Sequence, residues 1–434
     1  MPTPSPSPSP SSSLSPSPSS SSSLSPSPSS SSSLSPSPSS SLFPSSPLSP
    51  SPSSSRSPSP RRAVVVGAGI GGLAAAVALR RTRWAVTVHE RAPSLDPLGA
   101  GLVLWPNAVH ALDAIGLGGA VRESALVLGE SALRRPDGRF LSRTDGARIS
   151  ARHGAPLLGI RRSDLHALLT DAVGAEALRL GSEVHDPAAL AADHDLLVGA
   201  DGLRSRVRAA GWPGAQAAYA GYTAWRAVVR ADVPVTGMSE TWGRDERFGI
   251  VPMPGGWVYV FATATVGPGL RAGDGAAELA ELRRRFGRWH APIPALLDAL
   301  EPDAVLRHDV DALPRVPARL HHGTTALLGD AAHAMQPNLG QGACLAIEDA
   351  VVLAHTLADG APVERALEHY SALRRPRAVA LSRASAGIGR VTQGVGPVGA
   401  AMRDAAVRLT PPRLVLRGSD RAAGWSPPAL PSPV

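Results

Sequence analysis

The chain has 434 residues, a formal net charge of +8 and one cysteine, Cys344. A single cysteine excludes an intramolecular disulfide, so we expect a protein that needs no oxidising compartment and works in the cytoplasm. All 43 basic residues are arginines that are spread among acidic residues, which together with an aromatic content of 4% argues against nucleic-acid binding. No apolar stretch reaches the roughly 20 residues of a membrane span, so we expect no integral membrane segment.

Residues 1–60 form a compositionally distinct segment with 34 serines and 17 prolines. Within it, the sequence SSSLSPSPSS starts at residues 11, 21 and 31. Such a segment cannot bury a core, and it contains only one arginine where a transit peptide would be arginine-rich. We therefore predict a disordered low-complexity tail, followed by one large α/β unit or two interlocked domains.

The first half of the remaining chain alternates strands and helices. A β-branched run at residues 63–66 enters a glycine cluster, and an Ala/Leu-rich helix follows at 73–80. The Pro/Asp/Gly sequence at 136–138 is typical of a hairpin turn. The next predicted elements are a strand at 85–90, a helix at 106–117, the hairpin at 131–142, a helix at 164–172 after an apolar strand, and a buried strand at 195–199.

The second half begins with a change of period. Between residues 219 and 263 apolar residues recur at every second position, which predicts an antiparallel sheet with strands at 222–230, 247–251 and 257–263. Further predicted elements are a helix at 276–289, a strand at 325–328, a long helix at 342–357, and a mostly helical stretch at 363–409 that ends in a Pro-rich tail.

Three glycines, Gly67, Gly69 and Gly72, lie between the first strand and the first helix, and Glu90 follows the second strand. This context distinguishes them from a chance match at residues 394–399, which follows no strand and contains a proline. Glycines at this spacing let the backbone approach a pyrophosphate at a helix N-terminus, while the acid accepts ribose hydroxyls. The pattern predicts a dinucleotide site, although a Gly-rich turn without a ligand stays possible.

Two further motifs follow apolar strands. Gly329 and Asp330 end one strand, and the glycine-containing loop at 337–342 leads into the long helix. The positive N-terminal end of this helix would stabilise a ring that becomes anionic on reduction. A tight strand-to-helix connection is the simpler alternative for this loop. Asp201 follows the strand at 195–199, in the sequence GADGLRSRVR. An ordinary turn explains this Asp-Gly sequence equally well.

The predicted sheet offers a substrate wall. Period two places Tyr222 and Arg226 on one face of a strand, and Trp257, Tyr259 and Phe261 on one face of another. An arginine there would bind a substrate carboxylate or phenolate, although a structural ion pair explains the arginine equally well and plain core packing explains the aromatic residues equally well. For Cys344, packing is a simpler explanation than nucleophilic chemistry, and we expect no metal site.

Taken together, the segments GAGIGG with Glu90, VGADGLRSRVR and LLGDAAHAMQPNLGQG resemble the class A flavoprotein monooxygenases, the group of para-hydroxybenzoate and salicylate hydroxylases. The resemblance covers residues 61–390 and includes the segments at 99–117, 160–169 and 219–229. It implies an α/β fold in which a Rossmann-like FAD-binding domain of the GxGxxG type is interleaved with an antiparallel-sheet substrate domain and followed by a helical C-terminus.

The resemblance also assigns roles to residues. The glycine turn would hold the FAD pyrophosphate, and the loop at 339–342 the flavin ring. Asp201 would contact both FAD and NAD(P)H. The implied cofactor-binding residues are Gly67, Gly69, Gly72, Glu90, Arg91, Arg162, Asp201, Gly329, Asp330, Gly340 and Gly342, and the residues around the flavin ring and substrate are Arg226, Tyr222 and Pro337.

The implied reaction uses NADH or NADPH as a transient co-substrate and passes one oxygen atom of O₂, through a flavin C4a-hydroperoxide, to a small aromatic substrate. The motif HAMQPNLGQGACLAIED is also similar to that of zeaxanthin epoxidase, so an isoprenoid epoxidase stays open, as does a flavin-binding protein without turnover. We expect a monomer or homodimer. The implied domains are FAD-binding at 61–130, 146–215 and 311–390, substrate-binding at 131–145 and 216–310, and a C-terminal helical segment with a tail at 391–434.

Overall fold

The computed structural model describes residues 60–95 and 100–431. The tail predicted at residues 1–60 lies outside the described residues except for Pro60. None of the helices in the described part of the chain has both the length and the apolar character needed to cross a bilayer.

The first sheet is mainly parallel. Its strands β1, β2, β9 and β16 pair in parallel and are built from apolar runs such as AVVV and LLVG, which are buried almost throughout. Strands of this composition are typical of parallel sheets, because helices cover both of their faces. The strand order is β15 (His321–His322), β16 (Thr325–Leu327), β9 (Leu196–Gly199), β1 (Arg62–Val66), β2 (Ala85–His89) and β8 (Leu178–Arg179).

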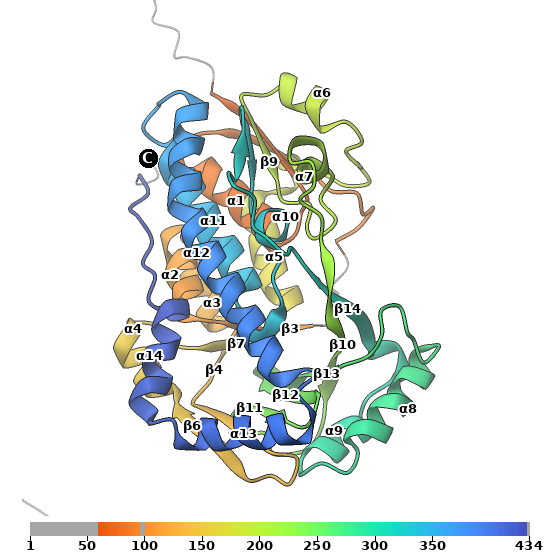
Figure 1. Ribbon diagram of the computed structural model, residues 1–434. Helices are drawn as coiled ribbons and strands as arrows, with labels where there is room; N and C mark the ends of the chain where they lie inside the picture. The colour runs from red at the N-terminus through yellow and green to blue at the C-terminus, as the bar shows by residue number, and fades with distance from the viewer. Residues whose placement is uncertain (1–59, 96–99, 432–434) are drawn as a thin grey trace, which may run out of the picture. The chain divides into compact units, whose positions relative to one another are not determined.

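Helices pack on this sheet around one large apolar core (Figure 1). Helix α1 (Ile70–Arg81) contacts α11 (Gly342–Leu357) and α5 (Arg162–Val173), and α11 also contacts α2 (Pro106–Ala114) and α12 (Val363–Thr392). The buried residues of α1 from Leu73 to Leu79 are only Leu, Ala and Val. These small side chains let α11 approach closely, so the starts of the two helices can share one site.

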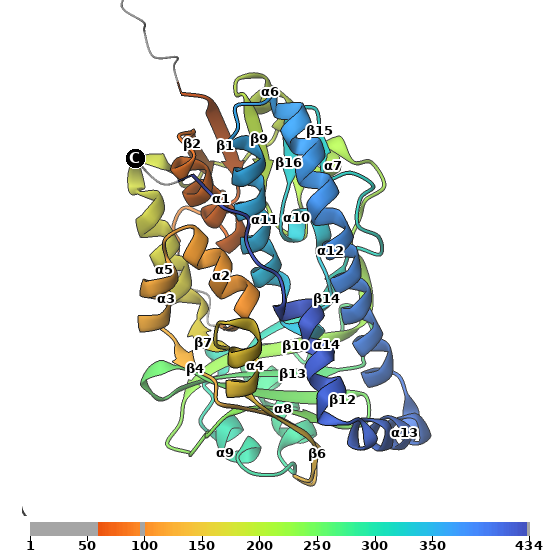
Figure 2. The same cartoon turned by 90° about the vertical axis from the view of Figure 1, so that its left-hand side faces the viewer.

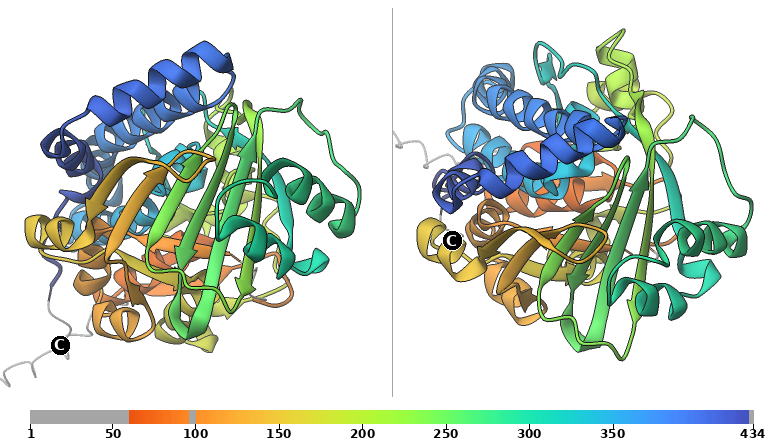
Figure 3. Two further views of the ribbon diagram at one scale, coloured as in Figure 1. Left: turned by 90° about the horizontal axis from the view of Figure 1, so that it is seen from below. Right: turned by 60° about the horizontal axis from the view of Figure 1, so that its bottom comes forward.

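The second sheet has seven strands and is antiparallel except for the pair β11–β5. Helices α8 (Gly275–Phe286) and α9 (Ile293–Asp298) pack on one of its faces (Figure 3). The order is β14 (Leu306–Ala312), β10 (Ala218–Arg230), β13 (Trp257–Ala264), β12 (Glu246–Pro252), β11 (Met238–Trp242), β5 (Glu130–Arg134) and β6 (Phe140–Asp145).

The two faces of this sheet have different neighbours. In β13, Val258, Val260 and Ala262 pack with α8 and α9, whereas Tyr259 and Phe261 point to the opposite face. A third sheet meets that opposite face: it consists of β3 (Gly101–Leu104), β7 (Leu158–Arg161) and β4 (Leu126–Val127), and its β3 contacts β13. The aromatic face of β13 therefore points toward the part of the fold that contains the parallel sheet.

The structure corrects the sequence predictions at several places. The short strands β3, β11 and β14 were not predicted, and the Pro-rich tail begins later than expected: α14 (Pro412–Ala423) follows α13 (Gly396–Leu409), and residues 424–431 then form no regular element (Figure 2). Two prolines, Pro411 and Pro412, lie at the N-cap and the first position of α14. A proline is tolerated there because a first-turn N–H has no helical partner.

The remaining helices are short. The α-helices are α3 (Gly118–Glu123), α4 (Gly146–His153), α6 (Pro187–Ala192), α7 (Arg206–Gly211) and α10 (Asp330–His333), and the 3-10 turns are Ala175–Ala177, Pro254–Gly256, Pro302–Ala304 and Pro337–Leu339.

A buried ion pair connects α8 to the second sheet. Glu278 accepts hydrogen bonds from Trp225 Nε1 at 2.8 Å and from Arg307 Nη1 at 3.0 Å. Burial alone would raise the pKa of Glu278, but these two donors and the Ala272 N–H outweigh it and lower the pKa. The carboxylate is therefore ionised and is the only acidic partner of Arg307 within the described residues.

We predict that Glu278→Ala lowers the free energy of unfolding by about 3–5 kcal/mol, because it leaves the Arg307 charge buried without a partner. Urea unfolding of the wild type and the variant measures this difference. The double variant Glu278→Leu/Arg307→Met removes both charges and should be more stable than Glu278→Ala. A single variant as stable as the wild type would contradict the structural role of the pair.

Candidate functional site

The turn between β1 and α1 has two crowded glycines and one open glycine. A Cβ at Gly67, whose φ is +104°, would lie 2.5 Å from the carbonyl oxygen of Ala200, and a Cβ at Gly72 would collide with the carbonyl oxygen of Gly67. At Gly69, by contrast, a Cβ would meet no atom of the described residues within 4 Å. Gly69 is also the N-cap of α1 and provides no side-chain cap. The turn thus leaves open space beside unpaired N–H groups at a helix start, as a pyrophosphate requires.

Glu90 braces the same turn from the end of β2. Its carboxylate accepts hydrogen bonds from the N–H groups of Ala68 at 2.8 Å and Ala92 at 2.9 Å. Each carboxylate oxygen has a second lone pair, so a ribose hydroxyl can still donate to it. Arg91 beside it is exposed. The structure therefore shows a bracing role for Glu90 that the sequence did not indicate.

A second turn brings to the start of α11 a carboxylate that has no hydrogen-bond partner among the described residues. Asp330 is exposed and lies next to Gly342, whose Cβ, if present, would be 3.9 Å from Asp330 Oδ1. The N-cap of α11, Gln341, gives no side-chain cap to this 16-residue helix. Unpaired N–H groups and an unpaired carboxylate side by side suit a ligand with both acceptors and hydroxyl donors, such as the ring and ribityl chain of a flavin.

The starts of α1 and α11 lie next to each other. A Cβ at Gly71, in the first turn of α1, would lie 2.9 Å from Leu328 Cδ1 and 3.0 Å from Ala346 Cβ. Leu328 precedes the Gly329 turn, and Ala346 lies in the second turn of α11. One elongated cofactor can therefore reach both helix starts, and the residues present fit FAD.

The Asp201 side chain shapes a neighbouring turn. Its carboxylate accepts hydrogen bonds from Ser205 Oγ at 2.5 Å and from the N–H groups of Arg206 at 2.7 Å and Val207 at 3.2 Å, so it holds the start of α7. From α7, Arg208 Nη1 donates to the carbonyl oxygen of Ala331 at 2.9 Å. Asp201 thus supports the Gly329–Asp330 turn from a distance, a role that the sequence alone did not show.

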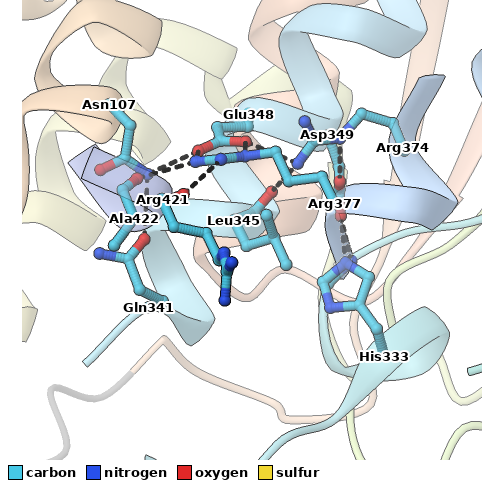
Figure 4. Close-up of polar contacts among 11 residues, drawn as sticks. Asn107, His333, Gln341, Leu345, Glu348, Asp349, Arg374, Arg377, Arg421 and Ala422 are labelled. Carbon is cyan, nitrogen blue, oxygen red and sulfur yellow. Dashed lines mark hydrogen bonds and ion pairs between the residues drawn. The ribbon is translucent and has the colours of Figure 1, made fainter. Parts of the chain in front are cut away.

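A buried polar network holds the start of α11 in place (Figure 4). Asp349 accepts hydrogen bonds from the Gly329 N–H at 3.0 Å, from His333 Nε2 at 2.6 Å and from Arg374 Nε at 2.6 Å. Burial alone would raise the pKa of Asp349, but His333, Arg374 and the Gly329 N–H outweigh it and hold the pKa well below its ordinary value. An ionised Asp349 therefore fixes the turn that carries Asp330.

The adjacent Glu348 extends the network to two other helices. It accepts from Asn107 Nδ2 of α2 at 2.5 Å and from Arg377 of α12 at 2.6 Å, and Arg374 Nη2 lies 2.7 Å away. Asn107 also donates to Gln341 Oε1 at 3.0 Å, which leaves the buried Gln341 Nε2 and Asn107 Oδ1 without a partner among the described residues. Such orphaned polar atoms beside the open helix start are further positions that a ligand or water can satisfy.

Two guanidinium groups face this region from other elements. Arg162 starts α5, and Arg226 lies on the face of β10 that carries Phe261 and Tyr259 in the paired strand. Burial lowers the pKa of Arg162, Asp330 opposes this effect, and the positive charge of Arg226 lowers it further. Burial likewise raises the pKa of Tyr259, whereas Arg226 and Arg162 lower it. Arg162, Arg226, Asp330 and Tyr259 therefore form one electrostatically coupled group.

Tyr222 and Arg247 reach from the second sheet to the loop before α11. Tyr222 Oη donates to Asn338 Oδ1 at 3.1 Å, and Arg247 Nη2 donates to the same oxygen at 2.5 Å. Burial raises the pKa of Tyr222, so the hydroxyl keeps its proton at neutral pH. Pro337 is exposed in this loop, and Gly340 has a φ of +62°. Tyr222, which we expected around the flavin ring and substrate, thus supports this loop through a hydrogen bond.

Sequence reasoning missed several residues of this region. Asn338 and Gln341 lie in the loop before α11, and the others lie on helix faces or strands, where ordinary packing explains any polar residue: Asn107, Arg247, His333, Glu348, Asp349, Arg374 and Arg377. One clue was available, because the adjacent acids Glu348 and Asp349 lie in an otherwise apolar helix, where buried charges need partners.

We predict that Gly69→Ala leaves the fold intact but weakens FAD binding by roughly tenfold or more, because its methyl group enters only the space for the pyrophosphate. Gly72→Ala should lower the free energy of unfolding of the apoprotein by roughly 1–3 kcal/mol through overpacking. Urea unfolding of apoprotein and FAD titration by flavin fluorescence measure the two effects. Equal FAD affinity in the wild type and Gly69→Ala would contradict the site.

A second prediction concerns Asp349. Its pKa is depressed in the folded protein, so its contribution to stability is present above its ordinary pKa and is lost as the pH falls below about 4. Asp349→Asn should therefore be less stable than the wild type by about 3–5 kcal/mol at pH 7, and the difference should shrink in acid. Asp359→Asn, at an exposed position after α11, is the control. A difference independent of pH would argue against an ionised Asp349.

Comparison with known proteins agrees with this geometry. Residues 149–385 match the family described as FAD binding domain, and residues 65–95 match the NAD(P)-binding Rossmann-like domain. The chain is 42% identical over 345 residues to the aurachin C monooxygenase/isomerase of Stigmatella aurantiaca, covering 76% of this chain and 89% of the relative. It is 32% identical over 338 residues to the FAD-dependent urate hydroxylase of Klebsiella pneumoniae subsp. pneumoniae, covering 73% and 86%.

Solved structures show the same fold. The crystal structure of Klebsiella pneumoniae HpxO with FAD and uric acid superposes with a TM-score of 0.75 and 29% identity, covering 82% of this chain and 95% of that one. The expected α/β fold with a Rossmann-like FAD-binding part, and FAD as cofactor, are thereby confirmed. These matches, together with the two helix starts that fit FAD, show that the chain belongs to the class A FAD-dependent monooxygenases.

Proposed function

We propose that this FAD-dependent monooxygenase uses NADH or NADPH and O₂ to hydroxylate a small aromatic substrate that binds against the aromatic face of β13. The observation that carries the proposal is the coupled group of Arg162, Arg226, Tyr259 and Asp330, in which Arg162 interacts electrostatically both with Asp330 before α11 and with Tyr259 on that face. Bound FAD supplies the electron transfer and oxygen activation. The protein must bind both partners, orient them and exclude water.

The proposed cofactor site combines the two helix starts. The turn of Gly67, Gly69 and Gly72 holds the pyrophosphate, and Glu90 with Arg91 the adenosine ribose. Asp330 accepts from the ribityl chain, which the Gly329 turn orients, and Arg162 contacts the chain or the phosphates. The loop with Pro337, Gly340 and Gly342 holds the flavin ring, and Asp201 supports FAD and NAD(P)H binding through α7. Open space at Gly69 and the unpaired Asp330 carboxylate support this assignment.

The proposed substrate site lies on the second sheet. Tyr259 and Phe261, whose ring centroids are 5.9 Å apart, offer an apolar wall, and Arg226 offers a charge on the same face. Among the described residues, the Arg226 side chain has no hydrogen-bonded carboxylate partner, which favours an anionic substrate group over the structural ion pair. An aromatic compound with a phenolate, enolate or carboxylate group fits these features.

The relatives support an aromatic substrate and leave its identity open. Their names refer to aurachin C, urate, 3-amino-4-hydroxybenzoate and 2-heptyl-3-hydroxy-4(1H)-quinolone. We propose a substrate of this general class, with residues 61–130, 146–215 and 311–390 contributing to FAD binding and 131–145 and 216–310 to substrate binding. A cytoplasmic location fits the single cysteine, which is buried and unpaired.

We predict that Arg226→Ala keeps FAD bound but weakens the stimulation of NAD(P)H oxidation by substrate, because the anionic group of the substrate loses its partner. Removing one charged hydrogen-bond partner should raise the substrate concentration for half-stimulation by roughly tenfold or more. Arg230→Ala, at an exposed position of the same strand, is the matched control. Oxidation of NAD(P)H and uptake of O₂ are measured across a panel of aromatic anions. An unchanged substrate dependence would refute the role of Arg226.

A further inference from the structure

Helix α13 has its charged residues inside and its large apolar residues outside. Arg403 and Asp404 are buried and form an ion pair at 2.7 Å, and Arg403 Nη2 also donates to the carbonyl oxygen of Gly243 at 3.0 Å. On the opposite side, Val398, Met402 and Leu409 are 72%, 69% and 82% exposed. This arrangement is the reverse of an ordinary surface helix, whose apolar side faces the core.

The exposed apolar residues form one continuous stripe. Val398, Met402 and Leu409 follow helical spacing, and the exposed Ala401 and Ala405 lie between them, so no polar side chain interrupts the stripe. After the short connection at residues 410–411, Leu414 of α14 is also 52% exposed. Scattered exposed apolar residues are normal, but a contiguous stripe of this kind marks a surface that binds a partner.

Four exposed arginines lie close to the stripe in the sequence. Arg408 follows it on α13, and α14 presents Arg413, Arg417 and Arg421 at four-residue spacing, which places them along one exposed side. Within the described residues, none of these four side chains has a hydrogen bond or ion pair to an acid. Both helices contact β6, and Arg377 Nη1 and Nη2 hold the end of α14 through two carbonyl oxygens at 2.8 Å (Figure 2). We refer to the exposed side of residues 396–421 as the α13–α14 face.

The acidic side chains of the same two helices already form ion pairs. Asp404 is paired with Arg403, and Asp420 accepts from Arg152 Nε at 2.6 Å and lies 3.3 Å from His153 Nε2. The α13–α14 face therefore combines an apolar stripe with unpaired positive charge and offers no free carboxylate of its own. Its partner should be apolar and negatively charged.

We propose that the α13–α14 face binds to the surface of a bilayer that contains anionic lipids. Apolar side chains on one side of a helix enter the boundary between headgroups and acyl chains, and neighbouring arginines contact the lipid phosphates. A second copy of the chain fits less well, because a twofold contact through this face would bring two sets of the same unpaired arginines together. The inference is independent of the proposed substrate, and the absence of a spanning helix among the described residues is compatible with peripheral binding.

The test uses the full chain loaded with FAD and vesicles of phosphatidylcholine, with or without 30% phosphatidylglycerol (about one lipid in three, enough to give a negative surface). After centrifugation, flavin absorbance measures the protein bound to the vesicles. We expect binding to the anionic vesicles, weaker binding at high salt because the charges are screened, and little binding to phosphatidylcholine alone. Equal, negligible sedimentation with both vesicle types would overturn the proposal.

Two variants separate the apolar and the charged contributions. Val398→Asp/Met402→Asp should reduce the affinity for anionic vesicles roughly tenfold or more, and its control is Leu270→Asp, at a residue 61% exposed outside the α13–α14 face. Arg413→Gln/Arg417→Gln should reduce the affinity for anionic vesicles roughly tenfold or more, since each arginine near an anionic surface raises this affinity about fivefold. Its control is Arg315→Gln/Arg319→Gln, which removes the same charge outside the α13–α14 face.

Sedimentation velocity of the same proteins distinguishes the lipid surface from a second copy. The proposal predicts the same mass in solution for the wild type and Val398→Asp/Met402→Asp, with flavin content and urea unfolding unchanged because both positions are exposed. A wild-type dimer that the double variant converts to a monomer would overturn it. Loss of vesicle binding in the two control variants to the same extent would also overturn it, because binding would then follow general charge and apolarity.

Discussion

The site depends on two adjacent buried carboxylates, Glu348 and Asp349, in the middle of the apolar helix α11. Asp349 holds the Gly329 N–H and thereby the turn that presents Asp330, while Glu348 connects α11 to α2 and α12. Each carboxylate would be costly to bury alone, and removing one partner of such a group costs about 3–5 kcal/mol. The arginines at 374 and 377 offset this cost, so the start of α11 has one well-defined position relative to the parallel sheet.

The same network connects parts of the chain that are distant in sequence. Arg377 binds Glu348 and also the carbonyl oxygens at the end of α14, so one side chain contacts both the end of α14 and the helix at the proposed flavin site. On the other side of α11, Tyr222 and Arg247 connect the loop at 337–340 to the second sheet. The flavin loop is therefore braced by both halves of the fold, which supports the precise placement that oxygen transfer requires.

Much of this arrangement could be predicted from the sequence, because local patterns encode it. The glycine turn, the Gly329–Asp330 turn and the alternation in β13 depend on neighbouring residues, and the structure places strands and helices where these patterns indicated. Partners that are distant in the chain could not be predicted. Asn338 meets Arg247 across 91 residues, and Asp349 meets Arg374 across 25, and no periodicity specifies such contacts. Helix α14 could not be predicted for a related reason, since the prolines at its start suit both a loop and a first helical turn.

We infer that the starts of α1 and α11 form one FAD site that accepts electrons from a nicotinamide. The most direct measurement is the absorbance spectrum of the purified full chain, followed by anaerobic titration with NADH and with NADPH. We expect a yellow protein, or a colourless one that takes up added FAD, whose flavin absorbance is bleached by at least one of the two donors. Protein that binds no added FAD would contradict the shared site, and bound FAD that neither donor reduces, even with aromatic anions present, would contradict the monooxygenase function.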